Sequence, residues 1–237
     1  MGTPESRFHQ ACDELGWGDA IHGLWFVAIE EAQEWQPHSE ATIERLYNHH
    51  EYFRDATVEG RTRPPDPPPE EGRSRSTYVE SNIAAPLSRS IPDPSRFRDL
   101  LLRLGGNVAH ANLYPLARPH TNQPFPKHYT DLFGFGPGPA ERKRYEEAVA
   151  GRRFPRLREA VEKLHPQAIV CMGKDWWSEF RGAFAATSEA RTIVAGKLLA
   201  YDRQKIILTT HFAFGHLSEA LQQHITDTLR AWSVELP

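Results

Sequence analysis

The sequence predicts an α/β protein: a three-layer α/β/α sandwich around a central, mainly parallel sheet of four strands. Four short, almost wholly apolar runs are spaced along the chain, as is typical of strands buried on both faces. Stretches with helical periodicity separate these runs, which is the pattern of crossover connections between parallel strands. The length of 237 residues fits one domain of this class, so we expect a single domain over residues 1–237.

The predicted strands are the four apolar runs. They cover residues 23–29 (GLWFVAI), 107–113 (NVAHANL), 167–172 (QAIVCM) and 205–209 (KIILT). Helical periodicity predicts helices over residues 39–54, 93–104, 140–150, 154–164, 174–186 and 218–233. Ser39 and the pair Asp93-Pro94 are suitable residues for starting a helix.

Composition excludes several classes of protein. No stretch approaches the roughly 20 apolar residues of a membrane span, and the N-terminus lacks the features of a signal peptide. The two cysteines, Cys12 and Cys171, cannot build a disulfide framework, so we expect reduced thiols in a cytoplasmic protein. A formal charge of -3 excludes a histone-like, general affinity for nucleic acid but leaves a local basic face possible.

The segment at residues 59–76 (EGRTRPPDPPPEEGRSRS) is rich in proline and arginine and has no large apolar residue. Proline at this density excludes a helix interior or a central strand. The segment is either a linker between domains or a long surface loop that touches a ligand. The strand pattern on both sides favours a loop within one domain.

Polar residues follow the predicted strands at the edge where α/β proteins bind ligands. Glu30 and Glu31 follow the first strand, Asn112 lies at the end of the second, and Gly173-Lys174 and His211 follow the third and fourth. A carboxylate, an amide, a glycine at a helix start and a histidine are therefore expected at one edge of the sheet.

In this order, the strand ends resemble the uracil-DNA glycosylase superfamily. In that family the first strand ends in a motif such as Gly-Gln-Asp-Pro-Tyr-His or Gly-Ile-Asn-Pro-Gly, and WFVAIEEAQ stands in its place here. The segment HANLYPLARP contains the match to the family's base-reading Asn. The segment PQAIVCMGKDWW matches the family's apolar run that ends in Gly, and LTTHFAFGHLS contains the match to the His of the DNA-penetrating loop. The resemblance covers residues 24–220 and implies the family's fold.

The resemblance also implies roles for individual residues. Glu30 stands at the position of the family's water-activating Asp or Asn, with Glu31 taking that role if the register is shifted by one. Asn112 stands at the base-reading Asn, and His211 at the His that donates to a carbonyl oxygen of the departing pyrimidine. Tyr78 is a candidate for stacking on the flipped base, with Trp35 as the alternative.

The sequence departs from the family's motifs at several places. In the first motif, Ala28 replaces the Gly, Glu30 replaces the Asp or Asn, and Glu31 replaces the Pro. After the last His, Phe212-Ala213 replaces the Pro-Ser. These differences place the chain outside the well-known branches that remove uracil.

One departure bears on the substrate. Ala32 stands where the uracil-specific branch has a Tyr that blocks substituents on ring carbon 5. The small side chain implies room for a pyrimidine with a bulky 5-substituent. Some members of the superfamily excise glucosylated hydroxymethylcytosine from phage DNA in bacterial defence, and this chain is similar to that branch.

The expected partner is double-stranded DNA, most specifically modified phage DNA. Gly173 and Lys174 at a helix start, and Arg73 and Arg75 in the proline-rich segment, are the expected phosphate contacts. We expect Phe214 to fill the gap left by the flipped base, with Phe212 and Leu217 as alternatives. No metal site is expected, because no histidine spacing fits a known zinc motif. No cofactor, membrane or obligate protein partner is expected either.

The leading hypothesis is therefore a monofunctional DNA glycosylase that flips a modified pyrimidine out of phage DNA and leaves an abasic site. A repair glycosylase for uracil or a damaged pyrimidine is the second possibility. A catalytically inactive nucleic-acid-binding module of the same fold is the third, because the first motif is altered. A small-molecule hydrolase comes last, because the chain lacks a Gly-x-Ser-x-Gly elbow and a glycine-rich phosphate loop.

Overall fold

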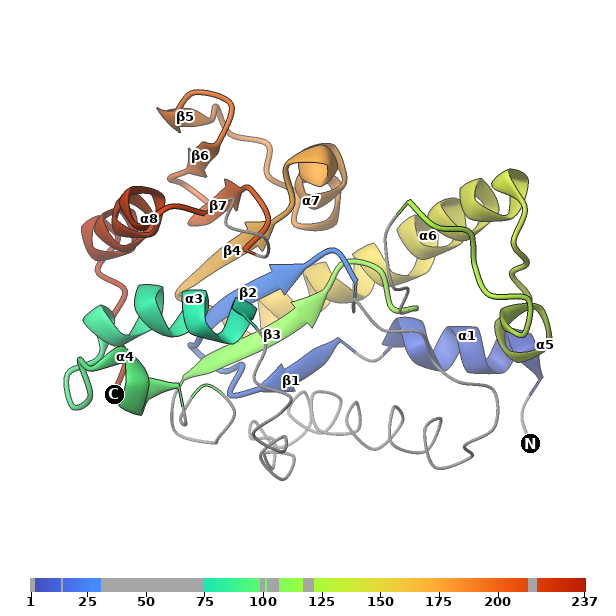
Figure 1. Ribbon diagram of the computed structural model, residues 1–237, viewed down its shortest axis with the longest axis horizontal. Coiled ribbons are helices and arrows are strands. Elements are labelled where there is room, and N and C mark those ends of the chain that lie inside the picture. The colour runs from blue at the N-terminus through green and yellow to red at the C-terminus, as the bar shows by residue number, and fades with distance from the viewer. Residues whose placement is uncertain are drawn as a thin grey trace.

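The computed structural model describes residues 3–13, 15–30, 75–98, 101, 107–116, 122–212 and 217–237. Its elements are arranged around one seven-stranded sheet with the strand order β1-β3-β2-β4-β7-β6-β5 (Figure 1). The strands are β1 (Gly16–Gly18), β2 (Leu24–Ala28), β3 (Val108–Asn112), β4 (Ala168–Met172), β5 (Arg191–Val194), β6 (Leu198–Tyr201) and β7 (Ile206–Thr209).

The α/β class and all four predicted strands are confirmed. β3, β2, β4 and β7 are mutually parallel and form the centre of the sheet. Their side chains are almost entirely buried, which explains why each appears in the sequence as a continuous apolar run.

The expectation of only four strands is wrong, because three antiparallel strands extend the sheet at both edges. β1 pairs with β3 at one edge, while β6 pairs with β7 and β5 with β6 at the other. β1 has three residues, two of them glycines, and a Cβ on Gly16 would lie 1.8 Å from the carbonyl oxygen of His110. Such a strand has no apolar pattern to detect, because close backbone approach and not side-chain burial defines it.

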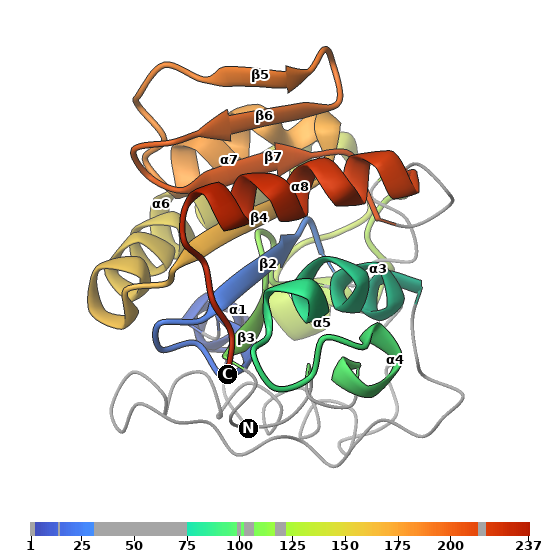
Figure 2. The ribbon, with the colours of Figure 1, turned by 90° about the vertical axis from the view of Figure 1, so that its left-hand side faces the viewer.

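Helices cover both faces of the sheet, giving three layers (Figure 2). On one face lie α1 (Pro4–Asp13), α5 (Tyr129–Phe133), α6 (Pro139–Leu164) and α7 (Trp177–Ala183). On the other lie α3 (Arg75–Ala84), α4 (Pro94–Phe97) and α8 (Glu219–Ala231). Two short 3-10 helices, η2 (Ala85–Leu87) and η3 (Lys174–Trp176), complete the described elements.

The starts of α8 and α4 agree with local sequence signals, although α4 (Pro94–Phe97) ends well before residue 104, where its end was predicted. Ser218 caps α8 by accepting from the backbone N–H of Leu221, and Asp93 caps α4 by accepting from Ser95 and Arg96. The predicted helix at residues 39–54 lies outside the described residues. Most of the segment at 59–76 lies outside them too, but its last two residues, Arg75 and Ser76, begin α3 instead of ending a loop.

The two helices predicted at residues 140–150 and 154–164 form one helix, α6, which continues through Pro155. A proline inside a helix removes one backbone hydrogen bond and ordinarily costs about 3 kcal/mol. Here α6 packs against α1 and α7 along its length, and Arg153, within the segment expected to break it, is fully buried. Tertiary packing therefore overrides the local preference for a break.

Both cysteines are completely buried, Cys12 in α1 and Cys171 in β4. Burial raises the pKa of the Cys12 thiol to about 12 and that of Cys171 well above its usual value. We expect neither thiol to react appreciably with a thiol-specific reagent at pH 8, since the thiolate is the reactive form. A spectrophotometric thiol assay should detect two thiols per chain only after denaturation; rapid labelling of the native protein would contradict the packing of α1 or β4.

Candidate functional site

The central strands place their carboxyl ends around a topological switch point. β2 is followed by the connection to β3 on one side, and β4 by the connection to β7 on the other. The chain therefore diverges between β2 and β4, and in open α/β sheets ligands bind outside the carboxyl ends at such a point. Ile29 and Glu30 follow β2 there, and Gly173 and Lys174 follow β4.

Asn112 ends β3 directly beside this point, in register with Ala28 of β2. The residue is only 7% exposed, and its carbonyl oxygen accepts a hydrogen bond of 2.9 Å from Arg153 Nε. Its side-chain amide makes no hydrogen bond with any of the residues that the structure describes. The amide atoms are not among the fully buried side-chain atoms that lack a hydrogen bond, so solvent reaches the amide and it is open to a ligand.

Asn112 belongs to a row of four residues across the end of the sheet, on the face covered by α3 and α8. We call this the Asn112 row; its members are Asn112, Ala28, Met172 and Thr209. Asn112, Met172 and Thr209 are buried, whereas Ala28, the smallest, is half-buried. The row is therefore accessible at Ala28, beside the unpartnered amide.

Glu30 lies two residues beyond β2 and is 8% exposed. Pairing between the two chain segments continues past the strands, since the backbone N–H groups of Leu113 and Tyr114 donate to Ala28 and Ile29 at 2.8 Å. Burial raises the pKa of the Tyr114 hydroxyl, and the charges of Glu146, Glu179 and Glu30 raise it further. Glu30 therefore lies within electrostatic range of Tyr114, whose hydroxyl stays protonated at neutral pH.

The α6 and α7 side of this edge is aromatic and charged. The Trp176 ring centroid lies 5.0 Å from that of Tyr114, and the Arg142 guanidinium lies 5.7 Å from the Trp176 ring centroid. Arg142 also donates to Glu146 at 2.8 Å. Among the described residues, no group of three or more His, Cys, Asp and Glu side chains is arranged to hold a metal ion.

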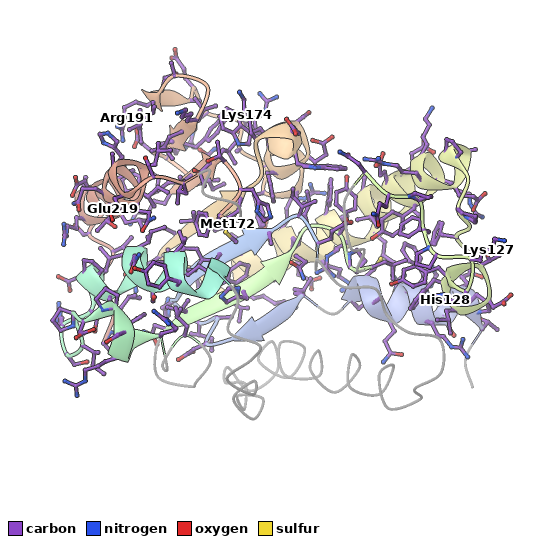
Figure 3. All side chains as sticks on the ribbon, in the orientation of Figure 1. Lys127, His128, Met172, Lys174, Arg191 and Glu219 are labelled. Carbon is purple, nitrogen blue, oxygen red and sulfur yellow. The ribbon has the colours of Figure 1, made fainter. Side chains whose placement is uncertain are left out.

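Gly173 allows β4 to approach the segment before Glu30. Its φ is +144°, and a Cβ there would lie 2.6 Å from Cδ1 of Ile29. Lys174 is exposed and begins η3, which has only three residues. Figure 3 shows Lys174 on the same side of the molecule as Arg191 of β5, far from Lys127 and His128 beside α5.

His211 lies two residues beyond β7 and is half-buried. The next residue, Phe212, is 1% exposed, with its ring centroid 6.0 Å from that of Phe26. Leu217 is also buried in the core. Phe212 and Leu217, the alternative residues for filling a gap in DNA, are thus part of the core instead, because they pack under α8.

The remaining predicted residues are placed differently. Tyr78 is 51% exposed on α3, with the Arg98 guanidinium 5.0 Å from its ring centroid, and the structure does not bring it to the Asn112 row. Arg75 begins α3, and its side chain is outside the description. Ala32, Arg73 and Phe214, together with the alternatives Glu31 and Trp35, lie outside the described residues.

Two features of this region were missed from the sequence. Glu80 of α3 and His110 of β3 form a buried pair, with 2.8 Å between Glu80 Oε2 and His110 Nε2. Arg153 donates to the carbonyl oxygens of Asn112, Ala11, Cys12 and Leu15. The polar residue His110 in the apolar run VAHAN was the one signal that pointed to the first feature.

No described helix is long and apolar enough to cross a membrane. The chain matches no model of a known protein family, and its sequence matches no curated protein. Any assignment of function to this chain therefore depends on the chemistry of the carboxyl edge of its sheet.

Proposed function

We propose that the protein is a DNA glycosylase that hydrolyses the N-glycosidic bond of a flipped, modified pyrimidine in duplex DNA. The observation that carries the proposal is the amide of Asn112, which lies beside the switch point and makes no hydrogen bond with any described residue. An amide offers both a donor and an acceptor, which suits the Watson–Crick edge of a base extruded from the duplex. The α/β sheet with ligand-facing carboxyl ends, and the resemblance of the four strand ends, support the same assignment.

The chemistry assigned to the site is a hydrolysis. A water molecule held by Glu30 adds its oxygen to the sugar carbon C1′ and gives a proton to the carboxylate, while the carbon–nitrogen bond breaks and its electron pair leaves with the base. The negative Glu30 also stabilises the cation-like sugar. His211 donates a hydrogen bond to the carbonyl oxygen of the departing base, which carries the developing negative charge.

The proposed substrate is a pyrimidine of phage DNA, with glucosylated 5-hydroxymethylcytosine as the leading candidate. The half-buried Ala28 in the Asn112 row supports access for a base beside Asn112. The contribution of Ala32 to room at ring carbon 5 stays a prediction from the sequence. Lys174, exposed next to the site, is the proposed phosphate contact, together with Arg73 and Arg75.

A base-release assay on duplex DNA tests the proposal. Three substrates are compared: DNA with glucosylated hydroxymethylcytosine, DNA with hydroxymethylcytosine, and DNA with uracil. Abasic sites and the free base are quantified by mass spectrometry. Release of the glucosylated base is the expected result. Release of uracil alone would make the protein a repair glycosylase, and DNA binding without release of any base would leave an inactive binding module.

Asn112→Ala is expected to lower kcat/KM for base release by about 10–10², the loss expected for two hydrogen bonds to the base. Asn112→Asp removes the donor but keeps the acceptor, so we expect it to change the preference between cytosine-type and uracil bases. Asn82→Ala is the matched control, because the Asn82 amide donates to Gln222 Oε1 at 3.0 Å within the α3–α8 interface. Unchanged base selectivity in both Asn112 variants would remove Asn112 from base recognition.

A further inference from the structure

Glu80 is a carboxylate placed inside the protein. It is fully buried in α3, and its closest charged partner is His110, with 2.8 Å between Oε2 and Nε2. The contact is not aligned as a hydrogen bond, and neither Glu80 oxygen accepts one from any described group. Burying a carboxylate with so few partners is costly, and a well-packed apolar pair of similar size is often at least as stable. Stability therefore does not account for this pair.

The pair lies next to the candidate site. His110 precedes Asn112 by two residues, so both side chains face α3, with their Cα atoms about 7 Å apart. The His110 side chain is 12% exposed, whereas its neighbour Phe26 is fully buried with its ring centroid 6.1 Å away. Ala28, diagonal to His110 on the sheet, is half-buried too. Solvent therefore reaches this face of β2 and β3 at Ala28 and at His110, the cross-strand neighbour of Asn112 and the residue two positions before it.

We propose that His110 is a second polar contact for the base that Asn112 reads, and that Glu80 is the positioning residue that fixes the His110 ring. This inference rests on the proposed function and adds a recognition pair to the same site. A carboxylate 2.8 Å from Nε2 restricts the orientation of the imidazole ring, because its negative charge attracts the Nε2 side of the ring. The recognised ligand is a planar heterocycle with at least two polar groups, one for the Asn112 amide and one for the imidazole.

The test compares wild type with Glu80→Gln and with the double variant Glu80→Leu/His110→Phe, which removes both polar groups so that no lone carboxylate is buried. Glu162→Gln and His224→Gln are matched controls on exposed helix positions. The probes are the free bases uracil and 5-hydroxymethylcytosine, used both as inhibitors of base release and as ligands in NMR spectra of histidine-labelled protein. Melting temperature is recorded for every variant.

We expect free base to shift the His110 resonances in wild type, and the double variant to weaken inhibition by free base at least about tenfold, the loss expected for one hydrogen bond to a ligand. Glu80→Gln should shift the His110 ring resonances even where folding is intact, because it removes the charge next to Nε2. The inference is overturned if free base leaves His110 unshifted, or if the double variant loses melting temperature but keeps wild-type inhibition.

The two failures are distinguishable. A wild-type protein that releases no base, yet whose His110 resonances shift with free pyrimidine, would contradict the glycosylase assignment and support the recognition pair. If the double variant releases base normally and free base inhibits it as it inhibits wild type, the result would support the glycosylase assignment. Glu80 and His110 would then be a structural pair only.

Discussion

Glu30→Gln is expected to lower the rate of base release by about 10²–10⁴, the usual contribution of a general base. The substitution keeps the size and hydrogen-bonding reach of the side chain but removes the charge and the ability to accept a proton. Glu30 is only 8% exposed, so its charge acts in a partly desolvated place where it has a large effect on a cation-like sugar. Single-turnover base release at saturating enzyme is the measurement, because it isolates the chemical step.

Glu189→Gln is the matched control, since Glu189 is exposed and lies away from the strand ends, between α7 and β5. DNA binding by Glu30→Gln should stay near the wild-type value, because the proposed role of Glu30 concerns the water and the sugar. A rate within about threefold of wild type would exclude Glu30 as the water-activating group. Loss of activity in Glu31→Gln instead would move the role by one residue.

Arg153→Met is expected to lower the free energy of unfolding by about 3 kcal/mol or more. The Arg153 side chain is 1% exposed and donates to four backbone carbonyl groups, of Ala11, Cys12, Leu15 and Asn112. Methionine fills much of the same volume but leaves these acceptors without their donor, and each buried unsatisfied group costs about 1–3 kcal/mol. For a chain of this size the melting temperature should fall by roughly 6–12 °C, measured by calorimetry.

Arg158→Met is the control for this variant. Arg158 lies on the same helix, α6, is half-buried, and donates to one carbonyl, that of Gly182, at 2.8 Å. We expect it to change the free energy of unfolding by less than about 1 kcal/mol, as is usual for an exposed polar contact. An equal loss of unfolding free energy in the two variants would show that the Arg153 guanidinium does not hold α1 against β3.

Arg153 also connects stability with the site. Its Nε bond of 2.9 Å to the Asn112 carbonyl fixes the end of β3, which carries the Asn112 amide. The same guanidinium fixes the C-terminal end of α1 and the residues after it. The Arg153 side chain, buried on the α6 face of the sheet, therefore fixes the backbone of Asn112, whose own side chain faces α3.

The amino-acid sequence alone was enough to predict the centre of the sheet. Strands buried on both faces have to be apolar throughout, so β2, β3, β4 and β7 are visible as short runs without any knowledge of their neighbours. Caps are equally local: Ser218 and Asp93 mark the starts of α8 and α4 because their side chains bond to backbone N–H groups a few residues away. Glu30 and Asn112 could be selected because strand ends in α/β proteins meet at one edge.

Tertiary structure decided the features that depend on residues distant in sequence. The edge strands β1 and β5 are defined by pairing with a neighbour and carry little apolar pattern. α6 continues through Pro155 because packing outweighs a local cost. Three of the four carbonyl partners of Arg153 lie about 140 residues away from it in sequence. Glu80 and His110 meet only when α3 is laid on β3. Burial and caps are short-range properties that a sequence carries directly, whereas the pairing of polar groups inside the protein is fixed only when the layers come together.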